Sequence, residues 1–303
     1  MKIAKIETFI ISRFLVVRVT DENGIQGIGE SCYWSYPKST EATILSFKDS
    51  LIGMDPRNTN HIWNYLWRYN SAFRGNSIGG AISAIDMALW DIKGKRLQAP
   101  VWDILGGKVR QKIRAIALGV GGNTPQECAD SAKSALDNGF SALKFTPMPD
   151  NWAELSYSKM IGLAVEMVEA VRETVGWDFD IGVEIHRNMQ PHEAIVFCEE
   201  VASLRPYFIE DPIVPDSVVA MQDVSTKMKL PLAVGERNMG IWEFREYAQL
   251  AKPAFFKPDI AVAGGITAVF EMPNTNPPTA NKVEFQKKLD LAKNRMYCNY
   301  AFY

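Results

Sequence analysis

The sequence predicts an α/β protein, a TIM-type (β/α) barrel preceded by a smaller α+β capping domain. The first observation is a change of pattern near residue 113, after which short apolar runs alternate with longer amphipathic segments. The second is that this strand-then-helix unit repeats at least six times. The repeat favours a closed barrel, although an open parallel sheet gives the same pattern. We therefore place the cap at residues 1–112 and the barrel at residues 113–303.

The predicted cap begins with a small antiparallel meander. Residues 1–30 alternate apolar and polar side chains, and Asp21-Glu22-Asn23-Gly24 is a turn signal between two strand-like runs. Residues 39–69 and 79–97 then have the apolar spacing of helices.

Six strands of the predicted barrel are short apolar runs. They occupy residues 113–120, 141–147, 179–186, 206–212, 231–237 and 254–260. Two further runs, 267–272 and 297–303, flank a helical pattern at 281–294 and are candidates for the remaining two strands. Because a parallel crossover usually needs about a dozen residues or more, the short link before Thr267 predicts a strained or incomplete closure.

Composition argues against several classes of partner. Lys and Arg number 33 and Asp and Glu number 35, so there is no electrostatic reason to expect nucleic acid or an anionic membrane surface. The four cysteines form no CxxC pair and are predicted to be reduced core residues of a cytoplasmic protein. No apolar run approaches the ~20 residues that span a bilayer.

Three glutamates stand at equivalent places on adjacent predicted strands. Glu184, Glu210 and Glu236 are each 26 residues apart, about the length of one β/α unit. A single acid after a strand is often a helix cap or a loop residue, but matched spacing makes that reading poor for all three. Crowded carboxylates repel one another unless a cation neutralises them, and oxygen ligands suit Mg²⁺. We predict that the three glutamates bind one Mg²⁺.

Other polar residues close predicted strands at the same end of the barrel. Lys144 follows the second strand, His186 the third and Asp259 the sixth. His186 lies two residues beyond Glu184, so the alternation of a strand points both side chains into one cavity. The alternative for Lys144 is an ion pair with a barrel carboxylate, and the alternative for Asp259 is a loop acid. His61 and His192, the other two histidines, are predicted to be structural and surface residues.

These residues, together with the stretch SAIDMALWDIKGKRLQAPVWDILGG, resemble the mandelate racemase branch of the enolase superfamily. VEIH, FIEDP, VGER and KPDIAVAGGIT follow in that family's order, and the resemblance covers about residues 1–267. It implies Glu184, Glu210 and Glu236 as metal ligands, although the first is more commonly Asp. The acid-x-His pair resembles galactonate- and gluconate-type dehydratases. The racemases' second strand-end lysine is replaced by Thr146, which argues against Lys-based racemisation.

The resemblance also implies a reaction. Mg²⁺ on the substrate carboxylate would stabilise the charge left by removal of the α-proton, a known property of this superfamily. His186 is the candidate general acid for the departing β-hydroxyl, with Lys144 and Asp259 as further catalytic residues. The product would be a 2-keto-3-deoxy sugar acid. Arg237, Trp34 and Tyr36 are the expected substrate-binding residues.

The end of the chain departs from that family. From about residue 263 the sequence resembles the early barrel of dihydroorotases and allantoinases, in the amidohydrolase superfamily, so residues 268–303 are predicted to be a foreign tail in a chimeric chain. The tail has no HxH pair, and no histidine follows His192, so Asp259 has no strand-7 histidine partner.

Three interpretations remain open from the sequence. The first is an acid-sugar dehydratase or a racemase or epimerase of the same branch. The second is a catalytically impaired chimera that keeps the metal site. The third is an amidohydrolase, whose chemistry would need an HxH pair that this sequence does not have. A small sugar acid is the expected substrate, and a homo-oligomer is expected.

Overall fold

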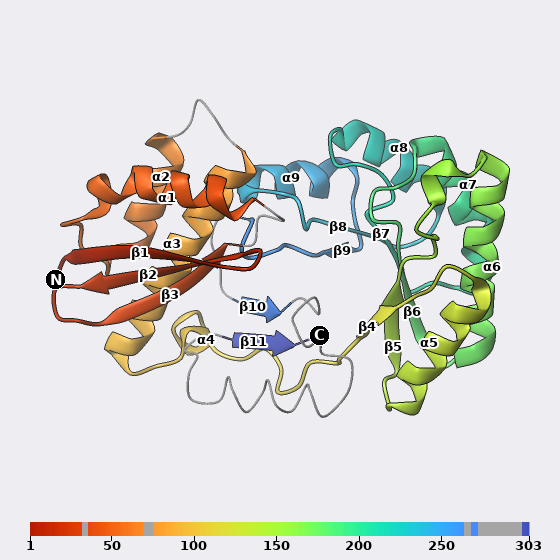
Figure 1. The fold of residues 1–303 in the computed structure, drawn as a ribbon, viewed down its shortest axis with the longest axis horizontal. Coiled ribbons are helices and arrows are strands. Elements are labelled where there is room, and N and C mark those ends of the chain that lie inside the picture. Colours follow the sequence, from red (N-terminus) through yellow and green to blue (C-terminus); the bar gives the residue numbers. More distant parts are fainter. Residues whose placement is uncertain (32–35, 70–74, 264–267, 272–298, 303) are drawn as a thin grey trace.

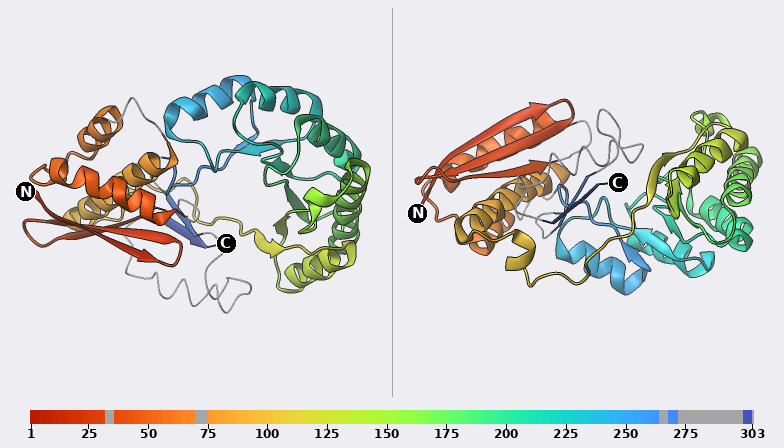
Figure 2. Two further views of the ribbon diagram at one scale, coloured as in Figure 1. Left: turned by 45° about the horizontal axis from the view of Figure 1, so that its top comes forward. Right: turned by 90° about the horizontal axis from the view of Figure 1, so that it is seen from below.

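A computed structural model describes residues 1–31, 36–69, 75–263, 268–271 and 299–302. The first part forms a three-stranded sheet covered by helices, and the second a curved parallel sheet with helices outside it (Figures 1 and 2). The predicted fold class, a cap followed by a parallel α/β barrel domain, is thereby confirmed. The boundary at residue 112 stays a prediction.

The cap sheet has the predicted meander. Strands β1 (Ile3–Ile11), β2 (Phe14–Asp21) and β3 (Gln26–Ser31) pair antiparallel in that order. The predicted turn joins β2 to β3, where the Asp21 carboxylate accepts bonds from the backbone amides of Asn23 at 2.8 Å and Ile25 at 3.0 Å. A side chain that satisfies the turn backbone in this way explains why the chain reverses there.

The cap helices are α1 (Pro37–Leu51), α2 (Thr59–Tyr69), α3 (Asn76–Leu97) and the short α4 (Val101–Ile104). The helical prediction over 39–69 corresponds to two helices, α1 and α2, separated by a turn. Gly53 in that turn has φ +88°, a left-handed conformation that ends α1 at little cost for glycine. The 79–97 prediction is confirmed within α3.

Glycines let α3 lie directly on the cap sheet. A Cβ at Gly27 would fall 1.9 Å from the carbonyl oxygen of Ala88, and one at Gly29 would fall 1.8 Å from that of Ala84. No side chain fits at such distances, so β3 presents bare backbone to the helix. The cap core of Leu15, Val17, Ile85 and their neighbours is closed by this contact.

All six predicted barrel strands are present and run parallel. In the sheet they follow the order of the chain: β4 (Ala117–Val120), β5 (Ala142–Phe145), β6 (Asp180–Glu184), β7 (Phe208–Glu210), β8 (Leu232–Val234) and β9 (Phe255–Phe256). The helices between them are α5 (Pro125–Asp137), α6 (Tyr157–Val175), α7 (Pro191–Val201), α8 (Val218–Met228) and α9 (Gly240–Leu250), with 3-10 turns at Trp152–Glu154 and Ala202–Leu204. They line the outer face of the sheet (Figure 2).

The barrel is not closed by the strands that the structure describes. β10 (Ala268–Glu271) and β11 (Asn299–Phe302) confirm the two predicted late strands. They pair in parallel with each other, in a sheet of their own. Within the described part of the chain they do not extend the six-stranded sheet, so the prediction that they replace strands 7 and 8 is not supported. The predicted helix at 281–294 lies outside the described residues.

A buried hydrogen bond joins cap to barrel. The Ser83 hydroxyl on α3 donates to the Ile260 carbonyl at 2.7 Å. Each part has its own apolar core, and the barrel core contains two free cysteines, Cys128 and Cys198, as predicted. Cys32 and Cys298 lie outside the described residues. None of the helices described is long and apolar enough to cross a membrane.

Candidate metal centre

The three predicted ligands lie at the carboxyl ends of neighbouring strands. Glu184 ends β6 and Glu210 ends β7, and the two are partners in the ladder that joins these strands. Glu236 follows β8 by two residues, after Gly235 with φ +132°. Consecutive parallel strands therefore carry the three acids to one edge of the sheet, as the spacing predicted.

Two of these glutamates already lie at ligand distance from a histidine. Single ligand atoms of Glu184, His186 and Glu236 all fall within 4.8 Å of one another. Glu210 is not part of this group, among the residues that the structure describes. The structure thus brings together Glu184 and Glu236 as predicted and adds His186 to them.

His186 reaches the site by a different route from the one predicted. Strand β6 ends at Glu184, so the alternation of a strand no longer applies at residue 186. Instead His186 and Arg187 adopt left-handed conformations, with φ +56° and +70°. This sharp turn, sparsely populated by non-glycine residues, leaves the His186 side chain exposed beside Glu184. His186 lies beside Glu184 and Glu236, and the turn, not strand alternation, places it there.

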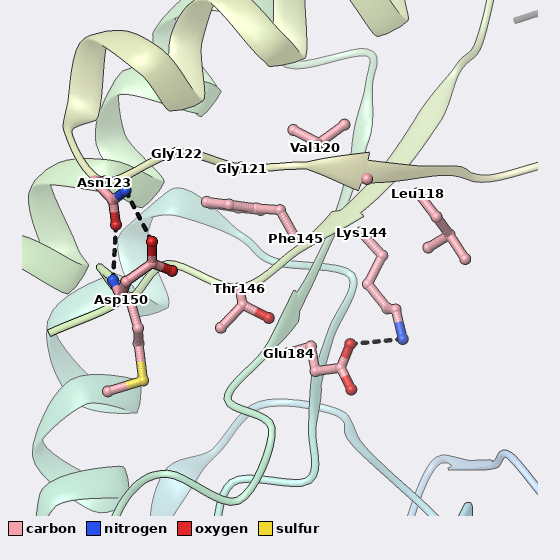
Figure 3. A pocket seen from close by; sticks show the side chains of 12 residues that line it. Leu118, Val120, Gly121, Gly122, Asn123, Lys144, Phe145, Thr146, Asp150 and Glu184 are labelled. Atoms are coloured by element: carbon pink, nitrogen blue, oxygen red, sulfur yellow. Dashed lines mark hydrogen bonds and ion pairs between the residues drawn. The ribbon is translucent and has the colours of Figure 1, made fainter. Parts of the chain in front are cut away.

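Two lysines neutralise the buried glutamates. The Lys144 ammonium lies 2.8 Å from Glu184 and 3.0 Å from Glu210 (Figure 3 draws the Glu184 pair). Lys257, just after β9, contacts the same Oε2 of Glu210. The Glu210 side chain is only 3% exposed, and a buried carboxylate needs such partners. Lys144 thus forms the ion pair with barrel carboxylates that the sequence offered as the alternative to a catalytic role.

The two ammonium groups respond to this environment in opposite directions. Burial alone would lower the pKa of Lys144, but attraction to Glu210 and Glu184 outweighs it and raises the pKa above its usual value. For Lys257, burial and repulsion from Lys144 outweigh the same carboxylates and lower the pKa. Lys144 is therefore a permanent cation in this arrangement, suited to holding an anionic group.

Glu236 is held by arginines. Arg187 bridges it to Asp211, whose Oδ2 lies 3.0 Å from the Arg187 guanidinium. The Nε of Arg237, a predicted substrate-binding residue, lies 3.4 Å from Glu236. Burial, followed by repulsion from Glu236 and Glu210, raises the pKa of Asp211 to about 7.

Asp259 lies three residues beyond β9, and its carboxylate accepts a bond from the Ala261 amide at 2.9 Å. Burial raises its pKa to about 6, although the Ala261 bond opposes this. The raised pKa places this acid closer to neutrality than an ordinary aspartate.

A cavity of about 350 Å³ opens beside Lys144 and Glu184 (Figure 3). The β4–α5 loop forms one wall, and residues after β5 form the other. The two walls are tied where the Asp150 amide donates to the Asn123 side chain at 2.7 Å and that side chain donates to the Asp150 carboxylate at 3.2 Å. Thr146, which replaces a racemase-type lysine, lines this cavity with Met148.

The cap residues predicted to bind substrate remain predictions. Tyr36 precedes α1 with its side chain 61% exposed. Trp34 lies outside the described residues. The remaining histidines are both exposed, and His192 stacks on Tyr157 with ring centroids 5.8 Å apart.

Sequence reasoning missed three residues of the centre. Asp211 and Lys257 sit in the recognised FIEDP and KPDIAVAGGIT motifs, and Arg187 directly follows VEIH. The signal was present, since charged residues at strand ends of a barrel share one cavity. Their pairing depended on side-chain directions that the pattern does not contain.

The donor set fits a hard divalent cation. Glu184 and Glu236 bring carboxylate oxygens within 4.8 Å of each other, with Glu210 on the strand between them. Carboxylates on rigid strand ends are the ligands that Mg²⁺ prefers. Three acids at adjacent strand ends, each paired with a lysine or arginine side chain, are consistent with such an ion.

Comparison with known proteins places the chain in a family. Residues 2–106 match the N-terminal domain of mandelate racemase / muconate lactonizing enzyme, and residues 127–273 match the enolase C-terminal domain-like family. The chain belongs to the enolase superfamily. The second match ends at residue 273, beyond the limit near 267 that the sequence predicted.

Relatives in this superfamily include dehydratases. The D-galactonate dehydratase of Klebsiella pneumoniae (strain 342) is 33% identical over 273 residues, which are 90% of this chain and 71% of the relative. A superfamily member from Salmonella Typhimurium superposes with a TM-score of 0.83 at 28% identity, covering 100% of this chain and 80% of that one. A protein from Mesorhizobium loti, provisionally assigned as a dehydratase, superposes with a TM-score of 0.82 at 30% identity. This match covers 100% of this chain and 80% of that one.

Proposed function

We propose that this enolase-superfamily chain is a Mg²⁺-dependent acid-sugar dehydratase, a hydro-lyase. The observation that carries the proposal is the cluster of Glu184, Glu210 and Glu236 at adjacent strand ends with His186 beside two of them. The identity of 33% to a D-galactonate dehydratase supports the same reaction class.

A divalent cation, when bound by Glu184, Glu210 and Glu236, supplies positive charge next to the substrate carboxylate and makes the α-proton more acidic. Lys144, buried and protonated, adds a fixed positive charge beside the same group. Arg237 and the cavity between Asn123 and Thr146 are the proposed contacts for the rest of the sugar acid.

The chain's own residues complete the proton balance. Asp259, with a pKa raised to about 6 by burial, is our candidate to take the α-proton. The electron pair of that C–H bond forms a C=C bond while the β C–O bond breaks. His186, exposed at the mouth of the site, donates the proton with which the hydroxyl leaves as water. The resulting enol rearranges to a 2-keto-3-deoxy acid.

A screen of aldonic and aldaric acids tests this proposal. We expect Mg²⁺-dependent formation of a 2-keto-3-deoxy acid from at least one of them, and none with Glu210→Gln. Release of the opposite epimer without water loss would instead identify a racemase or epimerase of the same branch.

A second candidate function is a metal-binding chain without turnover. It is favoured by one observation, that no histidine follows His192, so this sequence has none at the strand-7 position expected to pair with Asp259. We infer a chimeric tail over residues 268–303 from its amidohydrolase-like sequence. No product from the whole screen, together with Mg²⁺ binding in calorimetry, would support this candidate.

A further inference from the structure

We propose that Lys257 is a displaceable internal cation of the metal centre. It holds Glu210 while no metal is bound and competes with the metal for that carboxylate. This inference rests on the proposed function, because it takes Glu210 as a metal ligand.

The surroundings of Glu210 require a cation at all times. Its side chain is 3% exposed, and its Oε2 contacts both Lys144, at 3.0 Å, and Lys257. A carboxylate withdrawn from water is stable only beside positive charge. Two ammonium groups on one oxygen also repel each other.

Of the two lysines, Lys257 is the one free to leave. Lys144 belongs to the interior of strand β5, its side chain is 10% exposed, and it also holds Glu184 at 2.8 Å. Lys257 follows the two-residue strand β9 at the edge of the sheet, and its side chain is 29% exposed. Apart from Glu210, its ammonium rests over the Phe208 ring, 4.8 Å from the centroid.

The ligand geometry shows what the displacement accomplishes. Glu184, His186 and Glu236 already have ligand atoms within 4.8 Å of one another, in the described part of the chain, and Glu210 is outside that group. Glu210 is therefore the ligand that must turn to complete the set. Its contact with Lys257 must break for that to happen.

The balance of charge in the site also favours displacement of Lys257 by a metal ion. The ion pairs of the site join four basic side chains, Lys144, Lys257, Arg187 and Arg237, to four acidic ones, Glu184, Glu210, Glu236 and Asp211. A divalent ion added to this balanced group leaves an excess of two positive charges, and like charges in a buried site are costly. Moving the Lys257 ammonium toward solvent relieves part of that excess.

The test is binding of Mn²⁺ to the full chain, measured by electron paramagnetic resonance of the free ion and by calorimetry. Lys257→Met removes the charge and keeps the length of the side chain. Lys257→Gln removes the charge and keeps an amide donor, and Lys257→Arg keeps the charge. Lys133→Met is the matched control. The Lys133 side chain is 64% exposed on α5, where it forms an ion pair with Asp137.

We expect Lys257→Met and Lys257→Gln to bind Mn²⁺ about tenfold more tightly or better, since a competing charge is gone. Lys257→Arg and Lys133→Met should bind as the unaltered protein does. In EDTA, Lys257→Met should melt at a lower temperature than the unaltered protein. Mg²⁺ should then raise the melting temperature of the variant by more than it raises that of the unaltered protein.

Unchanged or weaker Mn²⁺ binding by both neutral variants, with normal binding by the unaltered protein, would overturn this inference and leave the proposed function standing. Absence of Mn²⁺ binding by the unaltered protein would overturn both.

Discussion

At the scale of single residues, the metal centre is organised by ion pairs between its glutamates and basic side chains. Each predicted ligand is paired with a basic side chain from another segment: Glu184 with Lys144, Glu210 with Lys257, and Glu236 with Arg187. The spacing of the acids predicted that they meet, because β/α units are equivalent. It did not predict the basic partners, since Arg187 and Lys257 obtain their positions from a left-handed turn and from the short strand β9.

The role of His186 can be separated from that of a ligand. If it is the general acid, His186→Asn should lower kcat by about 10²- to 10⁴-fold and leave Mg²⁺ affinity unchanged. Steady-state kinetics on the substrate found in the screen, with calorimetry of Mg²⁺, measures both. Because His186 lies within 4.8 Å of Glu184 and Glu236, a parallel loss of Mg²⁺ affinity would show that it is a ligand.

Asp259 makes the stability of the metal-free protein depend on pH. Its folded pKa of about 6 exceeds the ordinary value of 3.8, so the folded state holds its proton more tightly than the unfolded state does. The stability it contributes is complete below pH 3.8 and is lost as pH rises through about 6. The loss is about 3 kcal/mol, at 1.36 kcal/mol per unit.

Asp259→Asn should remove this loss while keeping an oxygen to accept the Ala261 bond. Urea unfolding in EDTA at pH 4 and at pH 7.5 measures it. We expect the variant to gain stability relative to the unaltered protein at the higher pH only. An equal difference at both values would mean that the carboxyl titrates normally.

At the scale of elements, apolar periodicity located every barrel strand, because a buried strand is a short apolar run whatever its partners are. It did not separate the two helices within 39–69, which are divided by the short non-helical stretch 52–58 that contains Gly53. The contact of α3 with β3 also escaped prediction. Gly27 and Gly29 appear in the sequence as ordinary strand glycines, yet each faces a backbone carbonyl of the helix.

Gly29→Ala should destabilise the cap. The added methyl would lie 1.8 Å from the Ala84 oxygen, so α3 must move off the sheet. We expect a loss of about 2 kcal/mol or more, typical of overpacking, measured by thermal melting. Gly162→Ala is the control, since this helical glycine of α6 has nothing within 4 Å of an added Cβ. It should stabilise by about 0.5–1 kcal/mol, and equal behaviour of the two variants would contradict the packing.

At the scale of the whole molecule, the parallel sheet has two edges. β4 pairs only with β5 and β9 only with β8, within the part of the chain that the structure describes. The short link after the sixth strand predicted that the barrel would close incompletely or with strain. It did not indicate that β10 and β11 pair with each other, because strand pairing over such separations leaves no local pattern.

Hydrogen exchange should reveal these edges. Backbone amides of β6 and β7, which have strands on both sides, should be the most protected in the sheet. Those of β4 and β9 should exchange faster, because an edge strand has one unpaired side. Exchange followed by mass spectrometry measures this, and equal protection of all six strands would indicate that the sheet is closed in solution.

In the proposed metal centre, Glu184, Glu210 and Glu236 together bind one divalent cation. The most direct measurement is an anomalous difference map from crystals of this chain grown with Mn²⁺. We expect a single peak at about 2.0–2.6 Å from a carboxylate oxygen of each of the three residues, with the Lys257 ammonium moved away from Glu210. A peak bound by Glu184, His186 and Glu236, with Glu210 still held by Lys257, would contradict it.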